Sequence, residues 1–472
     1  MKISLAIIPL IFLCTLMALV ISLFGDEALG GAAQIVLLTS AALAVTLALP
    51  GRHITFQKFE EAVSEKISSV AIALVILLLI GALAGSWMIS GIVPTLIYYG
   101  MQILSPSWFL VAACIICAAV SIMTGSSWTT IATIGVALMG IGQALGLSAG
   151  WVGGAIVAGA YFGDKMSPLS DTTVMASSTC GVKLFDHIRF MMGTTVPTLS
   201  ITLLAFLVVG WIVGTDGESD VSHIAQGLQA TFCISPWLLV VPLITGVMIA
   251  RRLPTLAILF CAVLMGTLTA VLVQPELLRQ IAGDGTDNGL VRGMLTMLYG
   301  DTHLETGIPM LNELVSTSGM MGMTSTIWLI ICAMIFGAAM TSTGMLQCIV
   351  VRLLSWPRRP VSLVATTAVT GIVMNAILCD QYLSIIITSS MFKDAYARLG
   401  FDARLLSRTI EDTATVTSPL LPWSSCGMTQ AHVLGISTLT YAPYALFNYL
   451  SPLMTVLVAA LFGKRFKTAT QP

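Results

Sequence analysis

The chain has 472 residues, of which 57% are apolar and only 9% are charged, and its net charge at pH 7 is −1. A soluble protein of this size needs far more charged side chains to cover its surface, so the composition argues against a soluble enzyme. The net charge gives no indication of a nucleic-acid partner or of an acidic partner surface.

Long uncharged apolar runs follow one another along the chain. They occupy residues 3–24, 28–49, 67–90, 107–124, 190–213, 254–273, 324–350 and 440–462. Each is close to or longer than the roughly 20 residues that cross a bilayer, and together with shorter segments they predict an all-α, polytopic membrane protein with about 12–14 membrane segments. The first run is too long for a signal peptide and lacks a cleavage site before Gly25, so we expect a transmembrane helix there.

Charged loops predict the orientation of these helices. Basic residues cluster in four segments, at 52–66, 251–252, 352–359 and 464–467. Two other segments, 216–220 and 274–322, are mainly acidic. Because basic loops stay in the cytoplasm, we expect both termini to be cytoplasmic. Residues 55–66 are amphipathic and are expected to lie on the membrane surface.

The chain contains a weak internal repeat. The stretch that ends at Gly146 aligns without gaps with the stretch that ends at Gly400 (400 − 146 = 254), and the same offset pairs Pro168 with Pro422 and Ser170 with Ser424. The first copy leaves a basic loop and the second leaves an acidic one, which predicts inverted repeats with discontinuous helices, as in many secondary transporters. The segments 126–146 and 382–398 are polar enough to be re-entrant hairpins instead of full crossings. The predicted divisions are 1–50 (two helices), 51–215 (first repeat), 216–310 (connecting helices and acidic outer loop) and 311–472 (second, inverted repeat).

Polar residues gather around Pro168 in the stretch GAYFGDKMSPLSDTT, residues 159–173. A proline lacks the backbone donor and clashes with the preceding turn, so the helix is expected to open here and free carbonyl oxygens. Within a membrane such backbone must be satisfied by protein or line a water-filled cavity. The stretch therefore predicts a hard-oxygen site for a small cation, although a cytoplasmic loop is the alternative. The candidate ligands are Asp164, Ser167, Asp171 and Thr172, with Lys165 as a resident cation or as the neutralising partner of an acid.

A second polar stretch, residues 407–425, has the same character in the other repeat. Acids in an apolar segment are unfavourable unless they face a cavity, bind a cation or are protonated. An ion pair with Arg408 or Lys393 is the alternative explanation. A third acid, Asp380, is expected to line the opposite side of a central site. The candidates in this half are Glu411, Asp412, Thr413, Ser418 and Asp380.

Buried carboxylates suit cation/proton exchange. Desolvation raises the pKa of a carboxyl group and a bound cation lowers it, so one group can hold a proton or a sodium ion but not both. We expect sodium and protons as transported ions, with no resident cofactor or structural metal. Cys114 and Cys117 form a CxxC pair without a nearby His or acid and are interpreted as packing residues. His303 and Glu305 are either ordinary loop residues or part of an entry vestibule.

The chain resembles the NhaC family of sodium/proton antiporters, within the ion-transporter superfamily. The matching stretches are residues 81–100, 124–146, 159–197 and 379–427. The resemblance implies an inner-membrane antiporter that works by alternating access, with the lipid bilayer and a small inorganic cation as partners, and it leaves a homodimer open. The family includes malate/sodium-lactate antiporters, so organic-acid exchange is the alternative, with Lys165, Lys183, Arg189 and Arg408 as groups that would hold a carboxylate.

Two other classes are weaker alternatives. An aspartyl intramembrane protease needs Gly-x-Gly-Asp, but Tyr161 stands where the first glycine would precede Asp164. A serine protease of this kind needs a histidine deep in a later helix, which the chain does not offer. A passive channel would conduct without saturable exchange, whereas inverted repeats with broken helices favour alternating access.

Overall fold

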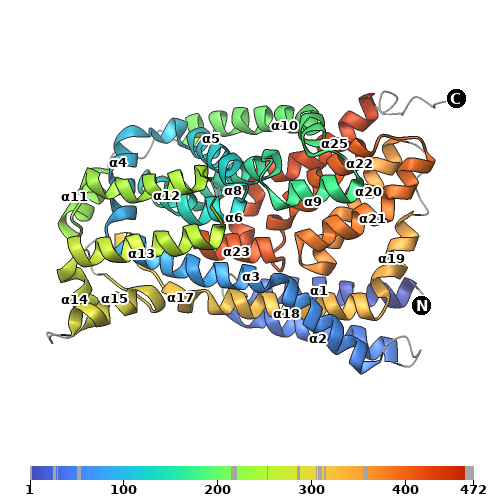
Figure 1. Ribbon diagram of the computed structural model, residues 1–472, viewed down its shortest axis with the longest axis horizontal. Helices are drawn as coiled ribbons and strands as arrows, with labels where there is room; N and C mark the ends of the chain where they lie inside the picture. The colour runs from blue at the N-terminus through green and yellow to red at the C-terminus, as the bar shows by residue number, and fades with distance from the viewer. Residues whose placement is uncertain are drawn as a thin grey trace.

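The computed structural model is helical, with its helices running mainly along the long axis of the molecule (Figure 1). Both ends of the chain lie at the right-hand end in that view, and α14 and α15 lie at the opposite end. Among the described residues the one β-type contact is an isolated bridge between Thr302 and Thr317. The predicted all-α class is confirmed. The structure describes residues 3–24, 28, 30–49, 55–213, 221–251, 253–283, 288–304, 306, 311–312, 315–354 and 360–462.

Some segments used above to predict orientation lie outside the described residues. They are residues 52, 216–220, 252, 358–359 and 464–467, together with Glu305.

The first half of the chain forms ten α-helices and one π-helical segment within the described residues. They are α1 (Ile3–Phe24), α2 (Ala32–Ala48), α3 (Phe56–Ile89), α4 (Ile92–Ile103), α5 (Pro106–Thr124), α6 (Ser127–Thr130), η3 (Ile131–Gly135), α7 (Val136–Ala144), α8 (Ala149–Met166), α9 (Asp171–Cys180) and α10 (Leu184–Val213).

The connecting region and the second half continue the same pattern. The connecting elements are α11 (Val221–Thr231), η4 (Pro236–Leu239), α12 (Val240–Ala250), α13 (Thr255–Val273), α14 (Pro275–Ala282), α15 (Gly289–Tyr299) and α17 (Gly319–Gly322). The second half comprises α18 (Thr324–Ser342), α19 (Met345–Leu354), α20 (Pro360–Leu378), α21 (Gln381–Arg398), α22 (Ala403–Ile410), η5 (Glu411–Thr415), η6 (Ser418–Leu420), α23 (Ser425–Leu434), α24 (Thr438–Tyr441), η7 (Ala442–Tyr444) and α25 (Leu446–Phe462).

The chain is a multi-pass membrane protein. Seven helices among the described residues are long and apolar enough to cross a membrane, and up to nine if each bent pair is one span. The sequence-based number of 12–14 is higher because it also included interrupted and polar segments such as α6–η3–α7 and α8–α9. Large apolar side chains such as Leu204, Leu268 and Leu453 are more than half exposed, as expected for helices that face lipid.

Helix α3 extends beyond the apolar run that predicted it. Residues 55–66 were expected to lie on the membrane surface, and residues 56–66 are the first turns of one 34-residue helix that continues to Ile89. Thr55 caps this helix by accepting a hydrogen bond from the amide of Lys58. No Gly or Pro interrupts the sequence before Gly81, so nothing ends the helix at residue 66. The position of these first turns at the membrane surface stays a prediction.

The internal repeat is visible in the boundaries of the helices. Helix α5 starts at Pro106 and α20 at Pro360 (360 − 106 = 254), and the same shift relates both ends of α9 to both ends of α23. The turns after α5 and α20 also match, because Gly125 and Cys379 both have positive φ, at 69° and 56°. Two halves of one chain thus repeat the same sequence of helices, turns and caps.

Candidate functional site

Helix α8 ends at Met166, two residues before Pro168, and α9 begins after a short turn. The opening that Pro168 predicts is therefore confirmed. The hydroxyl of Thr173 reaches back to the end of α8 and contacts the carbonyl oxygens of Asp164 and Lys165 at 3.3 and 3.0 Å. This threonine satisfies carbonyl groups that a continuous helix would have used itself.

Asp164 lies in the last turn of α8 with only 4% of its surface exposed. One carboxylate oxygen accepts hydrogen bonds from the amide and the hydroxyl of Ser127, at 3.2 and 2.7 Å. The other accepts one from the hydroxyl of Ser170 at 2.6 Å. Ser127 is the first residue of α6, so the tip of the α5–α6 hairpin and the start of α9 both converge on this carboxylate.

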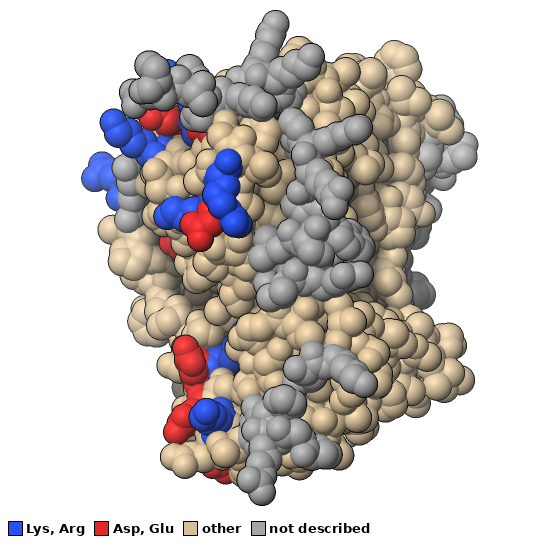
Figure 2. Space-filling model, turned by 90° about the vertical axis from the view of Figure 1, so that its right-hand side faces the viewer, with Lys and Arg blue, Asp and Glu red and all other residues tan. Residues whose placement is uncertain are grey.

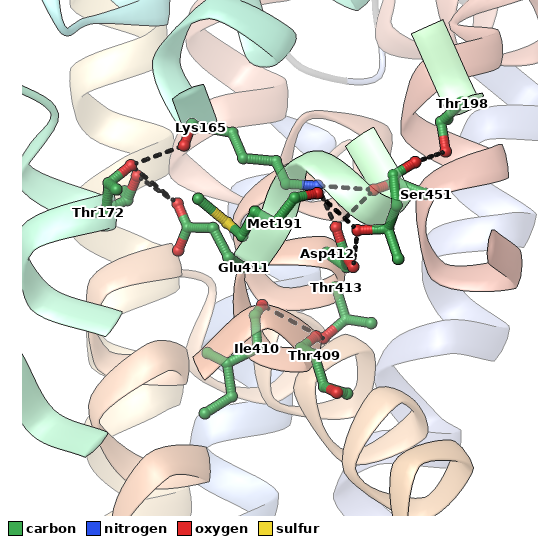
Figure 3. A network of polar contacts seen from close by, with 12 residues as sticks. Lys165, Thr172, Met191, Thr198, Thr409, Ile410, Glu411, Asp412, Thr413 and Ser451 are labelled. Atoms are coloured by element: carbon green, nitrogen blue, oxygen red, sulfur yellow. Dashed lines mark hydrogen bonds and ion pairs between the residues drawn. The ribbon is translucent and has the colours of Figure 1, made fainter. Parts of the chain in front are cut away.

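A chain of hydroxyl groups connects Asp164 with Glu411 of the second repeat. The Ser170 and Thr172 hydroxyls are 2.9 Å apart, and the Thr172 hydroxyl donates to Glu411 Oε1 at 3.0 Å. Thr173 approaches the same oxygen at 3.5 Å. Figure 3 shows Thr172 and Glu411 facing each other. Glu411 is fully buried, so two acids from different halves of the chain share one buried network.

A second contact between the repeats lies beside the first. Lys165 forms an ion pair with Asp412, and both side chains are fully buried (Figure 3). The Ser451 hydroxyl lies 3.2 Å from Lys165 Nζ and 3.2 Å from Asp412 Oδ1, and Thr194 donates to Asp412 Oδ2 at 2.9 Å. A buried ion pair is stable only with such additional hydrogen bonds. Lys165 thus neutralises an acid, which was one of the two roles expected of it.

Glu411 and Asp412 begin η5, a π-helical turn, which is wider than an α-turn and frequent at functional sites. Asn375 of α20 supports this turn by donating to the Ala414 carbonyl at 2.6 Å. Three buried oxygen atoms on or beside it, Glu411 Oε2, Thr415 Oγ1 and Asn375 Oδ1, have no hydrogen-bond partner in the described part of the chain. Buried oxygens without donors are unfavourable alone but suit a small hard cation.

Several predicted ligands lie outside this network. Asp171 has an exposed side chain in the first turn of α9. The hydroxyl of Ser167 donates to the Ile122 carbonyl at 2.7 Å, and that of Thr413 donates within its own helix to Thr409 at 2.6 Å. Both of these hydroxyls therefore hold backbone in place instead of facing the carboxylates.

The remaining candidates lie in the second half. Asp380 is buried and caps α21 by accepting a hydrogen bond from the Leu383 amide at 2.9 Å. Ser418 is buried and its hydroxyl lies 3.4 Å from that of Ser424. The guanidinium of Arg408 lies 4.8 Å from the centre of the Phe190 ring.

The sequence-based interpretation did not single out Thr194 and Ser451, which hold Asp412. Each is one of several polar side chains in a mainly apolar span close to a proline, Pro197 or Pro452. That pattern is too common in membrane helices to identify a ligand by itself. Ser127, Ser170 and Thr173 belonged to the polar stretches already recognised, but only the structure shows that they contact the acids.

Comparison with known proteins supports the resemblance predicted from the sequence. A sequence model of the Na+/H+ antiporter family matches residues 159–464. The chain is 39% identical over 386 residues to the Na(+)/H(+) antiporter NhaC of Alkalihalophilus pseudofirmus, covering 82% of this chain and 81% of that protein. It is 35% identical to the malate-2H(+)/Na(+)-lactate antiporter of Bacillus subtilis, covering 84% and 82% of the two chains.

A third relative widens the range of named substrates. The arginine/ornithine antiporter ArcD of Halobacterium salinarum is 33% identical over 457 residues, covering 96% of this chain and 90% of that protein. The family match includes both polar stretches and the contacts from Asp164 through Ser170 and Thr172 to Glu411. The NhaC resemblance predicted from the sequence is therefore confirmed, and this chain belongs to the Na+/H+ antiporter family.

Proposed function

We propose that this chain exchanges sodium ions for protons across a bacterial inner membrane by alternating access. The observation that carries the proposal is the buried chain of contacts from Asp164 through Ser170 and Thr172 to Glu411. It joins two acids from the two repeats at interrupted helices, where transporters of this architecture bind their ions. The family to which the chain belongs is one of transporters, and transport instead of enzymatic catalysis is part of the proposal.

The number of protons in the hydrogen-bonded series from Asp164 to Glu411 supports a proton-loaded state. Three oxygen–oxygen contacts join the two carboxyl groups, and each contact needs one proton, whereas the two hydroxyls supply only two. The third proton then belongs to a carboxyl group. Asp164 already accepts three hydrogen bonds from Ser127 and Ser170, which favours its ionised form, so the proton belongs to Glu411. In this proton-loaded state Glu411 donates to Thr172 and Thr172 donates to Ser170, whereas Thr172 donates to Glu411 when that carboxylate is ionised.

In the sodium-loaded state the cation takes the place of that proton. Glu411 would then be ionised, and its unpartnered oxygen, with the unpartnered hydroxyl of Thr415, would face the ion. The proton that leaves Glu411 and the sodium ion that binds each carry one positive charge, so the site has the same net charge in both loaded states. Lys165 stays paired with Asp412 and keeps the second acid out of this exchange.

The proposed orientation follows from charge at one end of the molecule. Five exposed basic residues lie in segments near the right-hand end of Figure 1, and Figure 2 shows charged side chains gathered on that face. They are Lys183, Arg189, Lys393, Arg398 and Arg404. Under the positive-inside rule this end, with both termini, is cytoplasmic. A green fluorescent protein fused to the C-terminus should fluoresce, and a dark fusion that is still inserted in the membrane would contradict the orientation.

The proposal needs no cofactor, structural metal or nucleic acid. The partners are the lipid bilayer, which surrounds the exposed apolar side chains, and the transported cation. A homodimer is the proposed assembly, to be tested by chemical cross-linking in native membranes and by mass determination in detergent.

The decisive experiment uses proteoliposomes with an imposed pH gradient and an internal pH-sensitive dye. Sodium should dissipate the gradient, whereas potassium, malate or lactate alone should not. Glu411→Gln and Asp164→Asn should lower the sodium-dependent rate about a hundredfold or more, because each removes one member of a buried charged network. Asp394→Asn, which changes an exposed acid at the charged end, is the control and should keep the rate.

The other outcomes have definite meanings. If sodium acts only when malate and lactate are on opposite sides, the chain is an organic-acid exchanger and the acids bind the coupling ion. If flux does not saturate with sodium, a channel replaces the antiporter. A loss in Asp171→Asn as large as in Asp164→Asn would restore the exposed Asp171 to the ligand set.

A further inference from the structure

A large cavity lies between α7, α23 and the helices α3, α4 and α18. Its volume is about 1040 Å³, and residues 316–319, on the segment that leads to α17, form part of its wall. The lining contains no Lys, Arg, Asp or Glu among the described residues, but hydroxyl and amide groups such as Gln143, Ser325 and Thr440 are present. A space of this size with polar groups on its wall is large enough to admit a hydrated cation.

The cavity approaches the buried acids from one side. Met428 of α23 lines it and is about one helical turn from Ser424, which caps that helix. Val136 of α7 also lines it and belongs to the broken helix that starts with Ser127, the hydrogen-bond donor to Asp164. The broken helix that carries Ser127 to Asp164 therefore also forms a wall of the cavity, and α23 forms another wall.

The corresponding place in the other repeat is closed. The Thr179 hydroxyl of α9 donates to the Ser389 hydroxyl of α21 at 3.0 Å, and Lys393 Nζ donates to the Thr179 carbonyl at 3.3 Å. Lys393 Nζ also lies only 3.9 Å from where a Cβ atom on Gly181 would stand. Figure 1 shows α9 and α21 next to each other toward the end that carries the termini. These contacts fill the space between the two helices.

The internal repeat relates Thr179, Gly181 and Lys393 to residues that line the cavity, whereas Gly135, the counterpart of Ser389, does not line it. The offset of 254 takes Thr179 to Val433 and Gly181 to Gly435, and it takes Met139 to Lys393 (393 − 139 = 254). Val433, Gly435 and Met139 all line the cavity. Equivalent helices pack against each other in both repeats, but Val433 and Met139 border the cavity, whereas Thr179 and Lys393 are in direct contact.

We infer that the cavity is the entrance through which the hydrated cation reaches the Asp164–Glu411 site, and that the contact among Thr179, Ser389 and Lys393 is the closed gate of the opposite entrance. The inference rests on the proposed cation exchange. Halves of repeat transporters move against each other around a fixed site. The state that separates Thr179 from Ser389 is therefore the state in which Val433 and Met139 approach each other.

A cross-link across the gate tests this directly. The variant Thr179→Cys/Ser389→Cys is made with Cys180→Ser, so that the new cysteine has no adjacent native thiol. A third substitution, Val433→Cys, reports on the cavity through labelling with a membrane-impermeant maleimide, measured by mass spectrometry of that peptide. Oxidation should lower sodium/proton exchange at least tenfold, and a reductant should restore it. Labelling at position 433 should continue at the same rate or faster.

Two results would contradict the inference that these residues form a closed gate. One is full exchange by protein that mass spectrometry shows to be cross-linked, and the other is loss of labelling at position 433 on cross-linking. Failure of the proposed function gives a different pattern, because the reduced variant and the unsubstituted protein would then both lack sodium/proton exchange while the labelling response remained. The single variants Thr179→Cys and Ser389→Cys, oxidised in parallel, control for effects of the oxidant.

A second variant keeps the inference testable if the cysteine pair does not fold. Lys393→Gln replaces the ammonium donor to the Thr179 carbonyl by a shorter, neutral amide on an exposed side chain, so folding should be unaffected. Loss of one hydrogen bond should destabilise the closed gate and slow labelling of Val433→Cys by roughly two- to tenfold. Lys183→Gln, another exposed lysine at the same end, should leave labelling unchanged. Equal labelling in both variants would contradict the gate.

Discussion

Two pairs of consecutive residues build the site, Asp164–Lys165 from α8 and Glu411–Asp412 from η5. Neighbouring residues on a helix point about 100° apart, so the two members of each pair face different surroundings. Asp164 and Glu411 meet through hydroxyl groups, whereas Lys165 and Asp412 meet directly. One acid pair is thus left to exchange a proton for a cation, and the ion pair beside it holds the repeats together.

The ion pair predicts a stability effect that a second substitution should reverse. Lys165→Met leaves Asp412 buried without its cation, which should destabilise the protein by about 3–5 kcal/mol. Lys165→Met/Asp412→Asn removes both charges and should recover most of that loss. Thermal unfolding in detergent measures both effects, with Lys183→Met as an exposed control within about 0.5 kcal/mol of the parent. A double variant as unstable as the single one would show that the pair is not the source.

The bridging hydroxyl of Thr172 predicts a change in ion affinity. Thr172→Val removes the group between Ser170 and Glu411 and should raise the apparent KM for sodium about tenfold, while Thr172→Ser keeps it near the parent value. Thr413→Val is the matched control, because that hydroxyl bonds only to the backbone of its own helix. The measurement is the sodium dependence of exchange in proteoliposomes, and equal KM values for Thr172→Val and Thr413→Val would contradict the assignment.

Elements end or change their geometry where the acids stand. Helix α8 ends next to Asp164, η5 widens at Glu411, and the hairpin turn between α5 and α6 points its first helical residue, Ser127, at Asp164. Broken helices offer unpaired backbone and side-chain groups that a continuous helix does not. The function therefore depends on short turns that must keep their shape.

The turn at Gly125 provides a prediction at this scale. Its φ is 69°, and a Cβ atom there would lie 2.6 Å from the backbone of Leu169, in the turn between α8 and α9. Gly125→Ala should destabilise the protein by more than about 1 kcal/mol and lower exchange, because it displaces that turn. Gly193→Ala, in the interior of α10 with nothing within 4 Å, should instead stabilise by about 0.5–1 kcal/mol. Thermal unfolding and exchange assays compare them, and equal effects would contradict the argument.

The two repeats share the arrangement of their helices but not the positions of their acidic residues. The offset of 254 takes Asp164 to Ser418, and it takes Val157 to Glu411 and Ala158 to Asp412. Each acid of the central network therefore has an uncharged counterpart. The two halves share a framework of helices and turns, while the charged groups of both converge on one site, as expected if a single cation and a proton compete for it.

Competition between sodium and a proton for one site predicts how sodium stabilises the folded protein. Above its dissociation constant, each tenfold increase in sodium should add about 1.4 kcal/mol to the free energy of unfolding. Because a proton must leave Glu411 first, the stabilisation should grow as pH rises and shrink as pH falls. Thermal unfolding at several pH values, with potassium as the control salt, measures this. Stabilisation that does not change with pH, or that persists in Glu411→Gln, would contradict a shared site.

The sequence by itself determined the class of protein, the repeat and the places where helices break. Apolar run length decides which segments enter a bilayer, and proline acts on the backbone of its own turn, so the break at Pro168 follows from local chemistry. The acids were identified because charge in an apolar segment is unfavourable without a function.

Only the tertiary structure decided which polar groups meet. Lys165 and Asp412 are 247 residues apart, and nothing local distinguishes Lys165 from Arg408 or Lys393 as the partner of that acid. The same holds for Asp171, which is as polar as Asp164 in sequence but exposed, and for Thr194 and Ser451, which are ordinary hydroxyls until packing places them beside Asp412. Contacts between distant helices depend on how their faces pack, and a sequence states the composition of each face but not which faces come together.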